Sequence, residues 1–247
     1  MSRLQAQWRR LYALPSPQGD HTQGPDLVGP QGQVRALVLQ LARPADWPAM
    51  AHLWQGVQDD LNLPAPAIAV NGVDGYQLWF SVSQAITADQ AHGFLTLLCH
   101  RYWAEVPAER VSLMPLAQGG TPPTWRHAAP VPAPARMAGQ WSAFVARDLA
   151  PVFNDSPWLD IPPNPEGQAD LLLRLRSIEH DELVALLGAS APAHAASAGS
   201  HTSPDPLVPQ APPQDAHQFL LRVMNDPTVE LALRIEAAKA LLLQPPA

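Results

Sequence analysis

Short apolar runs of strand length occur between residues 33 and 116, separated by two longer stretches in which apolar residues have helical spacing. The predicted strands are residues 35–41, 66–70, 76–82 and 111–114. Asp46 and Thr87 precede the two helical stretches as suitable N-caps, and the turn NGVDG joins the two middle strands. The order β-α-β-β-α-β therefore predicts an α+β fold.

This order is typical of a ferredoxin-like or RRM-like sheet with helices on one face. Alternation along the strands assigns Gln40, Gln77 and Trp79 to the other face, with Arg35 beside them. A tryptophan and amides on an open sheet face stack on a nucleobase and hydrogen-bond to it. Arg35, Gln40, Gln77 and Trp79 are thus the predicted nucleic-acid-binding residues. The alternative is that Trp79 packs under the helical segment after residue 140, which would close the face.

Clusters of proline and glycine divide the chain into six segments. They are a leader at 1–32 with a short helix over 4–12, the α/β unit at 33–116, a proline-rich connector at 117–139, a helical extension at 140–188, a disordered linker at 189–213 and a C-terminal helical hairpin at 214–247. In the extension, apolar spacing predicts helices over 140–153, 166–175 and 177–187, the last capped by Ser177. The extension is expected to pack against the sheet. The alternative is that its eight acidic residues, against three arginines, form a surface that binds a basic partner.

Two amphipathic helices joined by an Asn-Asp-Pro turn are predicted in the C-terminal segment. Its predicted partner-binding residues are Phe219, Met224, Leu231 and Ile235. About thirty residues bury too little surface to fold alone, so the segment is expected to dock on its own domain, on a second copy or on another protein. The segment resembles a short helical module of phage small terminase subunits.

The order of elements, together with LVLQLA and NGVDGYQLWFS, resembles the archaeo-eukaryotic primase superfamily, which includes primase-polymerases and RepB-type primases. The match covers residues 35–114. The family implies strands that carry metal-binding acids and a histidine, but Gln40, Ala42 and Gln77 occupy those positions here. Neutral side chains cannot replace carboxylates as ligands of divalent metals. The resemblance therefore implies a catalytically degenerate member with no catalytic residue, metal or cofactor.

The chain of 247 residues has a formal net charge of −7, which argues against capture of nucleic acid or anionic membrane over its whole surface. One cysteine, Cys99, excludes an intrachain disulfide and a cysteine-based zinc site. His92 and His100 are two helical turns apart and are expected to face solvent. Without an apolar run of about 18 residues or a signal-peptide pattern, a soluble cytoplasmic protein with no membrane contact is expected.

The leading hypothesis is a non-catalytic, primase-like protein of a bacterial mobile or phage-derived element. It would bind single-stranded nucleic acid or a partner in DNA replication or packaging. The alternative is a protein–protein adaptor without nucleic-acid contact, which the acidic charge favours. A third hypothesis is an active nucleotidyltransferase in which Asp74 is a displaced metal ligand, although an aspartate in a turn usually shapes the turn. P-loop, Rossmann and Gly-x-Ser-x-Gly motifs are missing from the sequence.

Overall fold

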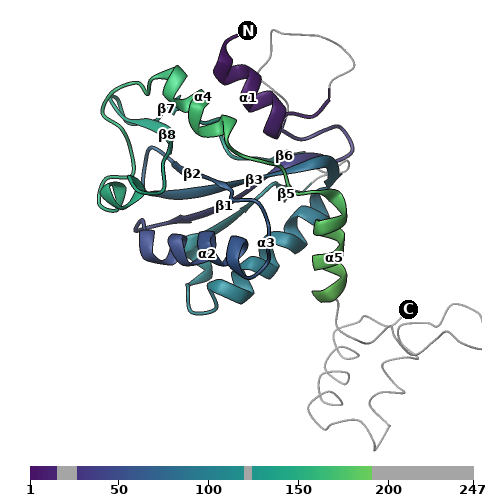
Figure 1. The fold of residues 1–247 in the computed structure, drawn as a ribbon. Helices are drawn as coiled ribbons and strands as arrows, with labels where there is room; N and C mark the ends of the chain where they lie inside the picture. The colour runs from purple at the N-terminus through teal and green to yellow at the C-terminus, as the bar shows by residue number, and fades with distance from the viewer. Residues whose placement is uncertain (16–26, 120–123, 191–247) are drawn as a thin grey trace, which may run out of the picture. The chain divides into compact units, whose positions relative to one another are not determined.

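A six-stranded antiparallel sheet with helices on both faces organises the protein (Figure 1). The structure is a computed structural model that describes residues 1–15, 27–119 and 124–190, all within the compact unit Met1–Ala193. The strand order is β4-β1-β3-β2-β8-β7, and every neighbouring pair is antiparallel. The fold class is therefore α+β, with two more strands than the four predicted for the sheet.

The helices and strands follow the predicted order through the first half of the chain. In sequence they are α1 (Arg3–Tyr12), β1 (Gln33–Ala42), α2 (Trp47–Asp59), β2 (Ala67–Val70), β3 (Gly75–Thr87), α3 (Ala88–Tyr102), η1 (Ala108–Arg110), β4 (Val111–Met114), β5 (Leu116–Gln118), β6 (Thr124–Arg126), β7 (Ala133–Pro134), β8 (Trp141–Val145), η2 (Ala150–Phe153), α4 (Pro165–Leu173) and α5 (His180–Ser190). Asp46 and Thr87 are N-caps, since their side chains accept hydrogen bonds from the backbone N–H groups of Ala49 and Gln90.

One face of the sheet packs against α2 and α3 and forms the larger core. Leu37, Leu39 and Leu41 of β1 are fully buried there, together with Leu78 and Phe80 of β3. This is the apolar set that alternation along the strands predicted. The prediction of helices on this face is confirmed.

The second face is also covered, which corrects the prediction of an open face and agrees with the alternative that the face is closed, although α1 from the leader takes part beside residues after 140. Helix α1 buries Trp8, Leu11 and Tyr12 against it, and α4 contributes Leu172. The two helices lie side by side over the sheet (Figure 1). At their exposed ends, Arg3 forms ion pairs with acids of α4. The fold is thus a three-layer arrangement in which the sheet lies between helical layers.

Residues 141–145 form strand β8 instead of the predicted helix over 140–153. The sequence WSAFV contains aromatic and β-branched residues that also suit a strand, and β8 pairs antiparallel with β2. This pairing extends the sheet and buries Ala143 and Phe144. Pairing between distant segments therefore outweighs the helical spacing of the apolar residues.

Helix α5 begins at His180, three residues after the predicted start, because the preceding residues join the sheet. Ile178 lies beside Val82 in a parallel bridge, donates its N–H to the carbonyl of Ser81 and accepts from the N–H of Ser83. The helix also continues through Ser190, two residues into the predicted linker. These backbone bonds hold the segment before α5 in an extended conformation.

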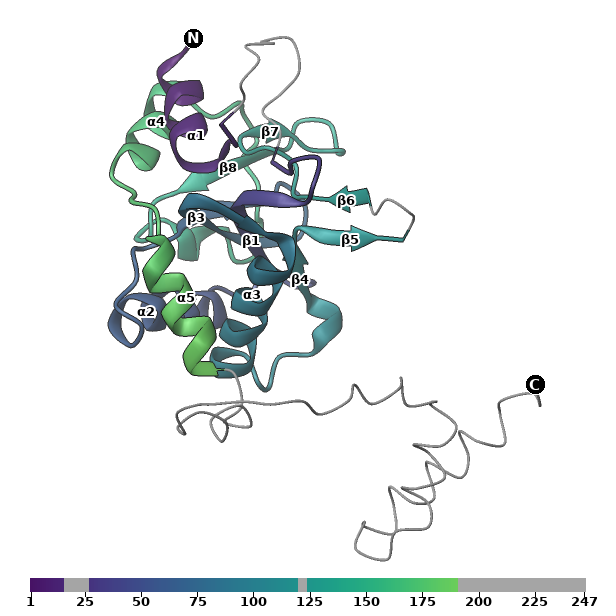
Figure 2. The ribbon, with the colours of Figure 1, turned by 90° about the vertical axis from the view of Figure 1, so that its right-hand side faces the viewer.

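The predicted connector at 117–139 contains regular structure in its described part. Strands β5 and β6 pair as a hairpin that projects beyond the end of β4 (Figure 2), and β7 pairs with β8.

No helix in the described ranges is both long and apolar enough to cross a membrane. Residues 191–213 of the predicted linker and the predicted hairpin at 214–247, with Phe219, Met224, Leu231 and Ile235, lie outside the described residues.

Candidate functional site

Trp79, the predicted base-stacking residue, lies in the interior of the protein and is 1% exposed. Its ring centroid is 5.3 Å from that of Tyr12 and 6.2 Å from that of Trp8, both in α1. Phe144 and His127 complete the cluster at 6.1 and 6.2 Å. A nucleobase has no access to this ring while α1 is in place. The prediction of an open stacking platform at Trp79 is therefore wrong.

Gln40 and Gln77 lie opposite each other on β1 and β3 and hydrogen-bond to each other. The Gln77 Nε2 donates to Gln40 Oε1 at 2.8 Å, and Trp79 Nε1 donates to Gln77 Oε1 at 2.9 Å. Gln77 is 6% exposed and Gln40 is half-buried. The two amides therefore satisfy a polar chain inside the protein instead of presenting their groups to a base.

Arg35 is the last predicted nucleic-acid-binding residue, and its guanidinium bonds to backbone carbonyls. It donates to Val82 at 3.0 Å, to Ala13 at 3.0 Å and to Arg10 at 3.1 Å. Burial lowers the pKa of the guanidinium. Because two of these carbonyls belong to the C-terminal end of α1, Arg35 holds that helix on the sheet.

Asp74 lies in the turn between β2 and β3 and shapes that turn. Its Oδ1 accepts from Asn71 Nδ2 at 2.9 Å, and Asn71 Oδ1 in turn accepts from the N–H groups of Val73, Asp74 and Gly75. This arrangement is the one expected of a turn-forming Asx pair. Among residues 1–15, 27–119 and 124–190, no three acidic, histidine or cysteine side chains gather closely enough to hold a metal ion.

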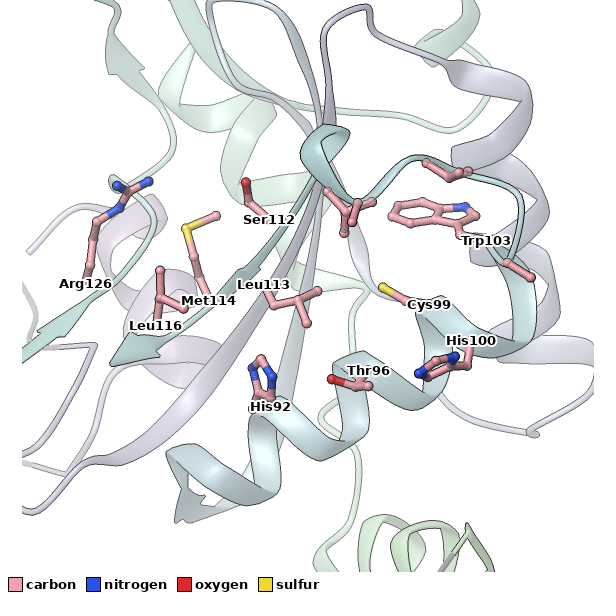
Figure 3. A pocket seen from close by; sticks show the side chains of 14 residues that line it. His92, Thr96, Cys99, His100, Trp103, Ser112, Leu113, Met114, Leu116 and Arg126 are labelled. Atoms are coloured by element: carbon pink, nitrogen blue, oxygen red, sulfur yellow. The ribbon is translucent and has the colours of Figure 1, made fainter. Parts of the chain in front are cut away.

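An apolar groove lies along the outer edge of the sheet, between β4 and α3 (Figure 3). Its volume is about 500 Å³. The lining residues are His92, Thr96, Cys99 and His100 from α3, Trp103, Ala104 and Val106 from the segment after it, Ala108 from η1, Val111, Ser112, Leu113 and Met114 from β4, and Leu116 and Arg126 from the β5/β6 hairpin. We call this site the β4 groove.

Strand β4 forms one wall of the groove and is an edge strand. Within the described residues it pairs with β1 alone, so backbone groups along its other side have no strand partner. Val111 and Leu113 pack partly against the core, whereas Ser112 and Met114 lie on the opposite side of the strand. The groove thus combines an open sheet edge with an apolar floor.

The charged and reactive groups of the β4 groove are few. Arg126 lies at the end near Met114 and Leu116, and none of the described lining residues is acidic (Figure 3). Burial raises the pKa of the Cys99 thiol to about 11, which keeps it protonated and weakly nucleophilic at neutral pH. Most of the described residues that line the β4 groove are therefore apolar.

Sequence reasoning missed the β4 groove, although part of its pattern was visible. His92 and His100 are exposed, as predicted. Together with Thr96, Cys99 and Trp103 they recur at positions i, i+4, i+7, i+8 and i+11, which is one face of a helix. The signal that this face borders an unpaired strand exists only in the tertiary structure.

Searches with the sequence found no matching protein-family model and no matching protein of curated function. The geometry of the sheet and of the β4 groove therefore carries the functional proposal.

Proposed function

We propose that this protein is a non-catalytic, primase-like binding protein of a bacterial mobile or phage-derived element, and that it acts as an adaptor for a partner protein. The partner contributes an extended segment that adds to the edge strand β4. The observation that carries the proposal is the outer edge of β4, which pairs with no strand of the described residues and lies beside an apolar groove of about 500 Å³. The sheet face, where a nucleic-acid site was predicted, is occupied by the protein's own helices.

The primase-like part of the proposal is supported by the arrangement of the first four strands. They are connected as β1-α2-β2-β3-α3-β4 and lie in the order β4-β1-β3-β2, which suits an RRM-like core extended by β8 and β7. Gln40 and Gln77 occupy the positions where the resemblance implies charged metal ligands, and they bond to each other. Neutral amides at these positions support loss of nucleotidyl transfer.

Two observations favour a protein partner over single-stranded nucleic acid. The aromatic and amide groups expected to contact bases are buried or bonded internally, and Arg35 donates to backbone carbonyls. The formal net charge of −7 also gives little attraction for a phosphate backbone, which supplies most nonspecific nucleic-acid affinity.

An open edge strand is a template for a further strand. Backbone hydrogen bonds along the edge give affinity, and a neighbouring pocket for alternate side chains gives specificity. In this protein, α3 and the segment after it supply such a pocket directly beside β4. An extended segment fits this site better than a helical one. The backbone groups of a helix are already hydrogen-bonded within the helix, so they cannot pair with the edge of β4.

The test is a selection of extended peptides from a display library on the full chain, followed by amide hydrogen exchange. Bound peptides should protect those amides of residues 111–114 that point away from β1, because the backbone N–H groups of an antiparallel strand alternate between its two sides. Ala104→Trp places an indole at an exposed position of the β4 groove and should abolish binding, whereas Ala138→Trp, at an exposed position outside the groove, should not. Binders that are indifferent to Ala104→Trp, or tight binding of oligo(dT) at low salt, would refute the proposal.

A further inference from the structure

We infer that the segment bound at β4 has apolar side chains at alternate positions and a carboxylate side chain at the end that lies next to Arg126. This inference rests on the proposed function and adds the chemistry of the partner. It depends on the length of the edge, the floor of the groove and Arg126, the one permanent cation among the described residues that line the groove.

The length of β4 limits how much of the partner is recognised. Val111–Met114 spans four residues, or roughly 13 Å at about 3.3 Å per residue. A partner strand of similar length therefore pairs along the edge. Only every second side chain of that strand points toward α3, because successive side chains of a strand alternate between faces.

The floor of the β4 groove selects apolar side chains at these alternate positions. Trp103, Val106, Val111 and Leu113 line it, and the Trp103 indole Nε1 is already bonded to the carbonyl of Ala49 at 2.9 Å. The tryptophan therefore presents its ring carbons and no free donor. A volume of about 500 Å³ has room for more than one aliphatic side chain, whose removal from water stabilises binding.

Arg126 selects a carboxylate at one end. It is exposed on β6 beside Leu116 and Met114, and no ion pair joins it to an acid in the described ranges (Figure 3). A guanidinium binds a carboxylate through two parallel hydrogen bonds, which a lysine or an amide cannot reproduce. Because the protein as a whole is acidic, a carboxylate is attracted to this end of the groove and repelled from most of the remaining surface.

The experiment uses a display library of extended peptides with an apolar residue at alternate positions and a choice of Glu, Gln or Lys at either end. Selection on the full wild-type chain should enrich Glu at one end, and changing that Glu to Gln should weaken binding by about tenfold. Arg126→Gln should remove the preference, and Arg126→Glu should shift it to Lys. Arg136→Gln, an exposed arginine outside the groove, is the matched control and should change nothing.

The outcomes separate this inference from the proposed function. Peptides that bind and are blocked by Ala104→Trp, but show no preference for Glu, would overturn the carboxylate inference and leave the proposed function in place. A library that yields no binder blocked by Ala104→Trp would overturn both. Sedimentation of the chain alone tests the remaining outcome. If the chain forms a dimer that Ala104→Trp dissociates, a second copy occupies the β4 groove and the inference is overturned.

Discussion

Replacing Gln77 by leucine tests whether the buried amides hold the sheet together. The side chain of Gln77 accepts a hydrogen bond from Trp79 Nε1 at 2.9 Å and donates one to Gln40 at 2.8 Å. Leucine has a similar size but neither polar group. Gln40 is half-buried and can reach water, whereas Trp79 is 1% exposed and its N–H would be left without an acceptor.

The expected loss of stability comes from the indole N–H of Trp79, which Gln77→Leu leaves without an acceptor. A buried polar group without a partner destabilises a protein by about 1–3 kcal/mol, so we expect Gln77→Leu to lower the free energy of unfolding by about 2 kcal/mol. For a compact unit of this size the melting temperature should fall by about 4–8 °C. Urea unfolding followed by circular dichroism measures the change in free energy.

A double-mutant cycle with Trp79→Phe isolates the hydrogen bond. Phenylalanine has no N–H, so Gln77→Leu should destabilise the Trp79→Phe protein less than the wild type, with a coupling of about 1 kcal/mol. Gln58→Leu is the matched control, because Gln58 bonds to the carbonyl of Trp54 in α2 and should combine additively with Trp79→Phe. Additive effects of Gln77→Leu and Trp79→Phe would refute the reasoning.

Three further predictions concern single titratable or polar groups. Tyr12 is fully buried and its hydroxyl has no hydrogen-bond partner among the described residues, so Tyr12→Phe should raise the melting temperature; a lower one would reveal an acceptor for that hydroxyl. Burial lowers the pKa of His127 below its usual 6.5, while its ring bonds to the carbonyl of Ala36 and the N–H of Ala128. Below about pH 6.5 the unfolded chain therefore binds a proton that the folded chain does not, and stability should fall as the pH decreases toward the pKa of the folded state. In urea titrations at about pH 7.5 and 5.5, His127→Asn should show a smaller drop than the wild type, and an equal drop would contradict this assignment. Cys99 is partly buried and burial raises the pKa of its thiol to about 11, so it should react with iodoacetamide at about pH 8 at least tenfold more slowly than free cysteine; comparable rates would show that the pKa is not raised.

The sequence by itself determined the features that depend on neighbours within a few residues. Each of these features depends on residues only a few positions apart. They are the helix caps at Asp46 and Thr87, the turn at 71–75 and the alternation of Leu37, Leu39 and Leu41 along β1. Such short-range preferences are the same in any tertiary context that permits them. For this reason the first half of the chain follows the predicted elements closely.

Only the tertiary structure decided which faces and edges are covered. Residues 141–145 form a strand because β2 offers them an edge, and Trp79 is buried because α1, some seventy residues earlier, packs over it. The β4 groove exists because β4 pairs on one side while α3 lies beneath it. Contacts between distant segments set burial, and burial decides which side chains are exposed to a partner, so the sequence pattern alone could not decide whether the face with Gln77 and Trp79 is open or covered.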